Sequence, residues 1–142
     1  DCIKIMKALK ADGIVTDLSI GERFGGKPGN ISVSGKSKSD LDGILTIPCW
    51  MIDLSFVEKR LDTIELMYGF RKEYPSNLFE TQVKDMERLI GSEAVIEMKE
   101  NDVGDRRQVA TVEKNGLRAK ITNKLDGDFS HSAPNILIYT PQ

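Results

Sequence analysis

The segment SFVEKRLDTIELMYG, residues 55–69, has the apolar spacing of an amphipathic helix. Four of its apolar residues recur every three or four positions and would share one helix face: Val57, Leu61, Ile64 and Tyr68. Ser55 and Glu58 have the spacing of a capping box, which satisfies free backbone N–H groups at a helix start. Gly69 supplies the left-handed residue on which many helices end. The segment is therefore predicted to be a helix.

Residues 77–91 repeat this pattern. Asn77 and Glu80 have the spacing of an N-cap and the third helical residue, and Gly91 follows the last apolar position. The apolar stripe consists of Phe79, Val83, Met86 and Ile90. Pro75 interrupts the helical pattern between the two segments. The pair predicts an αα-hairpin that must pack on something else, because helices this short are not stable alone in water.

The flanking segments have the signals of strands. Asn115-Gly116 is a strong two-residue hairpin signal, and residues 94–99 alternate as a half-buried strand does. The predicted strands are residues 14–20, 31–34, 44–52, 94–99, 107–114, 117–124 and 135–140. The last of them is apolar on both faces, which favours a central position. The prediction is one α+β domain over residues 1–142, an antiparallel sheet of five to seven strands covered on one face by an αα-hairpin inserted mid-chain.

Composition limits the classes of function. The 142 residues carry 20 basic and 22 acidic side chains, a balance that does not favour nucleic-acid binding through a general basic surface. Two cysteines do not form a disulfide framework, so a reducing, intracellular and cytoplasmic location is expected. The first ten residues lack the apolar core of a signal peptide. The chain does not begin with Met, which leaves open a targeting segment before residue 1.

Nucleotide and metal motifs lack their required context. Gly21, Gly26 and Lys27 reproduce the spacing of a phosphate-binding loop, but Pro28 stands where the motif needs a hydroxyl and a strand follows instead of a helix. One His and two Cys cannot supply a closed tetrahedral metal site. No cofactor and no metal are predicted.

Cys49 and His131 are the candidate catalytic pair. Cys49 is followed by Trp50, and His131 precedes a C-terminal strand. This arrangement resembles papain-like viral cysteine peptidases, whose thiolate lies at a helix N-terminus and is activated by an imidazole. The chain departs from that pattern, because the predicted helix begins only at Ser55 and leaves Cys49 in the preceding strand. A buried structural cysteine is the competing interpretation.

The densest basic grouping lies in the predicted strands after the second helix. It consists of Arg106, Arg107, Lys114, Arg118 and Lys120. Alternation would place several of these side chains on the solvent face, where charge is common in any sheet. An anionic surface, either lipid headgroups or nucleic acid, is the alternative ligand.

The expected function is a non-enzymatic protein-interaction or self-assembly domain. Its contacts are expected at exposed sheet edges or at the loops of residues 21–30 and 35–43. Compact chains with few motifs are typical of viral structural and accessory proteins. The alternatives are a papain-like cysteine peptidase using Cys49 and His131, and an adaptor for anionic surfaces that uses the basic strands.

Overall fold

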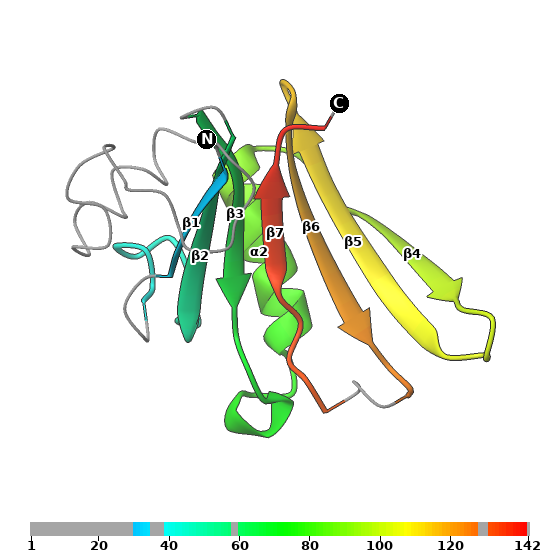
Figure 1. The fold of residues 1–142 in the computed structure, drawn as a ribbon. Helices are drawn as coiled ribbons and strands as arrows, with labels where there is room; N and C mark the ends of the chain where they lie inside the picture. The colour runs from blue at the N-terminus through cyan, green and yellow to red at the C-terminus, as the bar shows by residue number, and fades with distance from the viewer. Residues whose placement is uncertain (1–29, 35–38, 58–59, 128–130, 142) are drawn as a thin grey trace.

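The computed structural model describes residues 30–34, 39–57, 60–127 and 131–141 (Figure 1). The predicted strand at 14–20, the phosphate-loop spacing at 21–27, the predicted loop at 21–30 apart from Asn30, and residues 35–38 lie outside these ranges. In the described residues, seven strands form one antiparallel sheet in the order β1-β2-β3-β7-β6-β5-β4. The strands are β1 Asn30–Ser34, β2 Met51–Val57, β3 Arg60–Met67, β4 Val95–Glu100, β5 Arg106–Lys114, β6 Leu117–Lys124 and β7 Ile136–Tyr139.

The α+β class and the antiparallel sheet are confirmed, but the predicted αα-hairpin is wrong. The described residues contain one α-helix, α2 Leu78–Ile90, and a short 3-10 helix, η1 Arg71–Glu73. The segment predicted as the first helix, residues 55–69, instead forms the end of β2, all of β3 and the residues that follow. The two strands pair with each other antiparallel, with Leu54 opposite Ile64 and Ile52 opposite Leu66.

The reason for this error lies in two overlapping apolar patterns. Ile64 and Tyr68 belong to the predicted helical stripe, but they also alternate with Leu66 at the period of a strand. All three side chains are buried. In the sheet, Ile64 lies opposite Ile138 and Leu66 opposite Ile136, so β3 packs against a strand from the other end of the chain. Such distant partners are not visible in the local spacing, and they outweigh the local helical signal.

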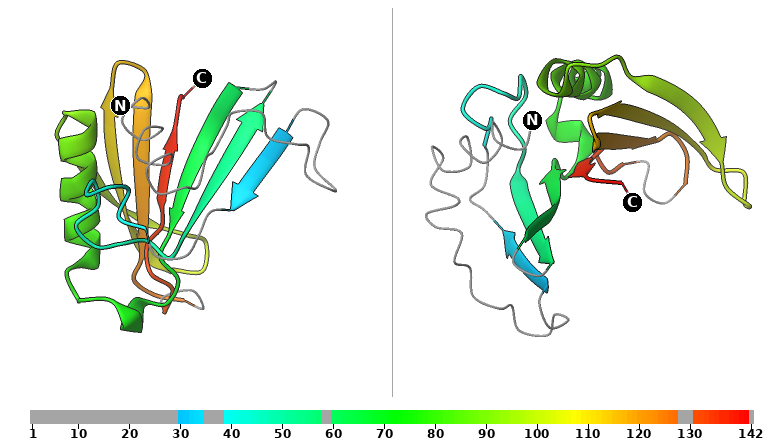
Figure 2. Two further views of the ribbon diagram at one scale, coloured as in Figure 1. Left: turned by 90° about the vertical axis from the view of Figure 1, so that its left-hand side faces the viewer. Right: turned by 90° about the horizontal axis from the view of Figure 1, so that it is seen from above.

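The second predicted helix is confirmed as α2, which covers one face of the sheet (Figure 2). Its stripe, Phe79, Val83, Met86 and Ile90, is buried, and the helix packs on β5 and β6. Gly91 ends it with a φ of 82°, the left-handed conformation expected there. The side chain of Asn77 makes no capping hydrogen bond, so that detail of the prediction is wrong.

Residues 39–50 form a loop that closes the core beside α2. Ser39 and Cys49 pair in an isolated bridge, and the loop turns through left-handed residues at Leu41, Asp42 and Gly43. Leu41 is fully buried, although the sequence predicted an exposed loop there. The predicted strand at 44–52 is mostly this loop, and only its last two residues belong to β2.

Candidate functional site

The described sheet ends in two edge strands, β1 and β4, and all six side chains of β4 are exposed. β4 has β5 as its neighbour on one side and none in the sheet on the other (Figure 1). The six pairs between β4 and β5 run from Val95–Thr111 to Glu100–Arg106 without a bulge. The outer side of such a strand presents backbone N–H and C=O groups that another strand can pair with. All six residues of β4 are exposed, so the prediction of a half-buried strand is wrong at this position.

Three large apolar side chains of β4 face solvent. The exposed fractions are 61% for Val95, 52% for Ile96 and 57% for Met98. By strand pairing, Ile96 and Met98 lie on the same face as buried Ala110, which is the face that α2 covers. Figure 2 shows β4 reaching beyond the part of the sheet under α2, so these side chains lie at the uncovered margin of the core.

We call the face of the sheet that carries α2 the helix face, and the opposite one the far face. Glu97 and Lys99 lie on the far face, with their charged atoms 3.9 Å apart. Lys99 is directly opposite Arg107, and Arg107 is directly opposite Lys124 on β6. These three side chains form what we call the cation row. Like charges directly opposite each other destabilise a sheet, and Glu97 offsets part of this repulsion at the Lys99 end of the row.

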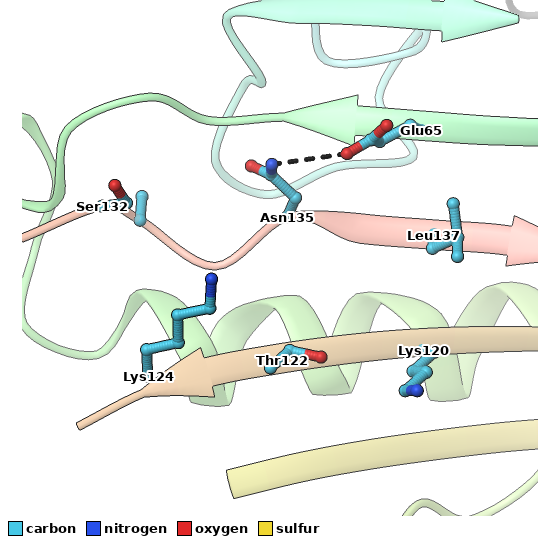
Figure 3. A pocket seen from close by; sticks show the side chains of 8 residues that line it. Glu65, Lys120, Thr122, Lys124, Ser132, Asn135 and Leu137 are labelled. Atoms are coloured by element: carbon cyan, nitrogen blue, oxygen red, sulfur yellow. Dashed lines mark hydrogen bonds between the residues drawn. The ribbon is translucent and has the colours of Figure 1, made fainter. Parts of the chain in front are cut away.

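The far face also holds a cavity of about 380 Å³ next to the cation row (Figure 3). It is lined by Glu65, Lys120, Thr122, Lys124, Ser132, Ala133, Asn135 and Leu137. Asn135 is fixed there, because its Oδ1 accepts from the N–H of Tyr68 at 3.1 Å and its Nδ2 donates to Glu65 at 3.5 Å. The cavity therefore combines two lysines with a carboxylate, two hydroxyls and an amide.

The five basic residues proposed from the sequence do not all share one face. Strand alternation places Arg107, Arg118 and Lys120 on the far face and Arg106 and Lys114 on the helix face. The Nζ of Lys114 donates to the carbonyl of Gly91, at the end of α2. Three of the five residues thus remain as a candidate anionic-surface site.

Two of these arginines have acidic partners. Arg106 binds Asp126 with N–O distances from 2.8 Å, and this hydrogen bonding raises the pKa of Arg106 and lowers the pKa of Asp126. Arg118 donates hydrogen bonds to Tyr139 and Glu113. Both bonds raise the pKa of Arg118, and the bond to Tyr139 has the larger effect. Arg118 and Arg106 therefore already have partners within the chain.

Cys49 and His131 occupy different surroundings. Cys49 is fully buried, and its thiol donates to the carbonyl of Ser39 at 3.3 Å. His131 is exposed, and its ring stacks on Phe70 with the centroids 6.4 Å apart. A catalytic thiolate must contact substrate, so this placement does not support the peptidase alternative, which stays a prediction.

The sequence did not indicate two polar residues on the buried side of α2, Gln82 and Asp85. Asp85 is 1% exposed and accepts from the N–H and hydroxyl of Thr46 at 3.0 and 2.7 Å. Gln82 is equally buried and donates to the carbonyl of Pro134 at 2.8 Å. The one signal in the sequence is their position: each stands directly before a residue of the apolar stripe, Val83 or Met86, and so lies next to the buried face of the helix. They fix loops to the helix and are not part of the β4 edge.

Within the described ranges, no helix is long and apolar enough to cross a membrane. The same residues contain no group of three His, Cys, Asp or Glu side chains placed to hold a metal ion. Comparison of the chain with protein-family models, with curated proteins and with solved structures gives no match.

Proposed function

We propose that the chain is a non-enzymatic protein-interaction domain that binds a protein partner by extending its sheet at β4. One observation carries this proposal: β4 is an edge strand of six consecutive exposed residues, three of them large and apolar. In this mode of recognition, main-chain hydrogen bonds give affinity, and alternate side chains give specificity.

β4 has few of the features that protect a sheet edge from pairing. Natural edges are often short, bulged, or interrupted by proline. β4 pairs with β5 over six residues without a break in register, and its sequence, VIEMKE, contains no proline. Its charged residues do protect it from indiscriminate pairing. They also select a partner, since an added strand must place compatible charges opposite Glu97 and Lys99.

The apolar residues supply a driving force. Complete burial of a Val, Ile or Met side chain is worth about 1.5–3 kcal/mol. Val95, Ile96 and Met98 are each more than half exposed, so an added strand with its own side chains has apolar area to cover on both faces of β4.

Site-specific photocrosslinking tests this proposal. A photoreactive phenylalanine analogue replaces Met98 in one variant and Glu80, on the exposed side of α2, in a control variant. We expect covalent protein adducts from position 98, and none from position 80, in the purified chain or in extract of the cells that produce it. Equal adduct patterns from the two positions, or no adduct from position 98, would contradict an interaction at β4.

A second candidate function is binding to a phosphate-bearing anionic surface through the far face. The cation row and Lys120 place four basic residues on adjacent strands of that face. Lys120 and Lys124 also line the cavity of Figure 3. Phosphate groups are bound by such clusters with strong dependence on salt.

Retention on heparin tests this candidate. Arg107→Glu reverses the central charge of the cation row, and Lys84→Glu makes the same change in charge on exposed α2. If the far face binds polyanions, Arg107→Glu elutes at lower salt than Lys84→Glu, and each lost phosphate contact lowers the salt slope by about 1. Equal elution of the two variants, or no retention of the wild type at low salt, would exclude the candidate.

A further inference from the structure

We propose that the strand added at β4 is β4 of a second copy of this chain, antiparallel, with Met98 opposite its own copy on a two-fold axis. This inference rests on the proposed function of β4 and names its partner. The argument is that the charges of β4 complement themselves in this register.

The geometry of a sheet limits how two identical strands can pair antiparallel. Side chains directly opposite each other lie on the same face, so the two-fold axis must pass beside a residue that faces its own copy. With Met98 on the axis, Glu97 of each copy faces Lys99 of the other. These two opposite-charge pairs lie on the far face, one on each side of the axis.

Other registers within β4 are worse. An axis at Glu97 would place two carboxylates directly opposite each other, and an axis at Lys99 would place two ammonium groups opposite each other; like charges in this position are destabilising. An axis at Ile96 would leave Glu97 facing Val95, so that no opposite charges pair within β4. Met98 is therefore the position that pairs opposite charges along the strand.

The same register gives Lys99 an acidic neighbour on its open side. Within one chain, Lys99 lies opposite Arg107, the centre of the cation row, and its ammonium group is 3.9 Å from the carboxylate of Glu97. Pairing two β4 strands extends the row with Glu97 of the second copy, so that the open end of three consecutive cations meets a carboxylate. The dimer thus adds a second carboxylate to the one that Lys99 contacts in the single chain.

On the helix face, the axis brings apolar side chains together. Met98 faces Met98 of the second copy. Ile96 of each copy faces Glu100 of the other and lies diagonal to its Met98, at the cross-strand distance of about 7–8 Å that long side chains span. Ile96 and Met98 are 52% and 57% exposed in the single chain. Because one short strand pair buries a small area, the dimer is expected to be weak and to dissociate on dilution.

Charge-exchange variants test the register. Glu97→Lys makes both facing pairs positive, and Lys99→Glu makes both negative. We expect each single variant to dimerise roughly tenfold or more weakly than the wild type in sedimentation velocity over a concentration series. An equimolar mixture of the two single variants restores association as a heterodimer, because one copy then carries only lysines at these positions and the other only glutamates.

The double variant Glu97→Lys/Lys99→Glu is the matched control. Its exchanged charges still face each other, so it is expected to dimerise like the wild type. All four positions in the paired strands are exposed, so the circular dichroism of every variant should match that of the wild type and show that the fold is retained. Association of the two mixed single variants at wild-type strength supports the register. A mixture that associates no more strongly than either single variant alone contradicts it.

The same experiments separate this inference from the proposed function. A wild-type chain that stays monomeric at every concentration, while position 98 crosslinks to a different protein, overturns the dimer and leaves β4 as an interaction surface. Monomeric behaviour together with no crosslink from position 98 overturns both.

Discussion

Tyr68 follows the end of β3 with its ring fully buried and its hydroxyl donating to the carbonyl of Ile47 at 3.1 Å. Burial raises the pKa of this phenol far above its ordinary value, and the nearby Cys49 and Asp85 raise it further. The ring of Tyr74 meets it edge-on, with the centroids 5.4 Å apart. Tyr68 thus links the loop of residues 39–50 to the sheet.

This pKa shift predicts how stability depends on alkaline pH. A phenol whose pKa is raised by folding contributes stability that is fully present below the unfolded value of about 10 and is lost as pH rises through the folded value. We expect the free energy of unfolding to fall above about pH 10, and Tyr68→Phe to reduce this fall. At neutral pH the same variant should lose about 1 kcal/mol, because it removes a hydrogen bond. Chemical denaturation at several pH values measures both effects. A Tyr68 hydroxyl that loses its proton near pH 10 in the folded chain would refute the account.

Asp85 holds the same loop to α2, and its contacts predict an order of destabilisation. It accepts two hydrogen bonds from Thr46 and one from Arg88, whose side chain is 59% exposed. Asp85→Ala leaves the Thr46 N–H without its acceptor and should cost about 2–3 kcal/mol. Arg88→Ala breaks an ion pair with one exposed member and should cost at most about 1 kcal/mol. Arg88 also donates to the carbonyl of Ile44 in the same loop. Urea denaturation ranks the two variants, and an equal loss in both would contradict the predicted order.

At the scale of elements, β2 and β3 show where local sequence is insufficient. The capping signal at Ser55 and the helical stripe are present, yet the segment forms strands because Ile64 and Leu66 align with β7. By contrast, α2 was predictable, since its whole stripe faces the sheet and no alternation competes with it. The turn at Asn115-Gly116 was predictable for a local reason as well, because both residues adopt the positive φ that this dipeptide favours.

An engineered disulfide distinguishes the hairpin from the predicted helix. Ser55 and Thr63 lie directly opposite each other on β2 and β3. In a helix, residues with this separation would be about 12 Å apart along the axis, too far for a disulfide. We expect Ser55→Cys/Thr63→Cys to form an intramolecular disulfide on oxidation, and the control Ser55→Cys/Glu80→Cys not to form one. Mass spectrometry of peptides after proteolysis identifies the bond, and its absence in the first variant would contradict the pairing of β2 with β3.

At the scale of the whole molecule, β7 joins the two halves of the sheet. This last strand lies between β3 and β6, so the three N-terminal strands and the three that follow α2 share one core (Figure 1). Its central position was predictable from apolar residues on both faces. The exposure of β4 was not, because its alternation is that of a half-buried strand, and only the order of strands and the extent of α2 show that it lies at the edge.

Amide hydrogen exchange over a concentration series tests most directly whether β4 is completed by a second copy. As the concentration of the purified chain rises, exchange should slow in β4, because its outer N–H groups gain acceptors, and should stay unchanged in α2. The slowing should disappear in the Glu97→Lys variant and return when an equimolar amount of the Lys99→Glu variant is mixed with it. Exchange in β4 that is the same at every concentration would contradict the account.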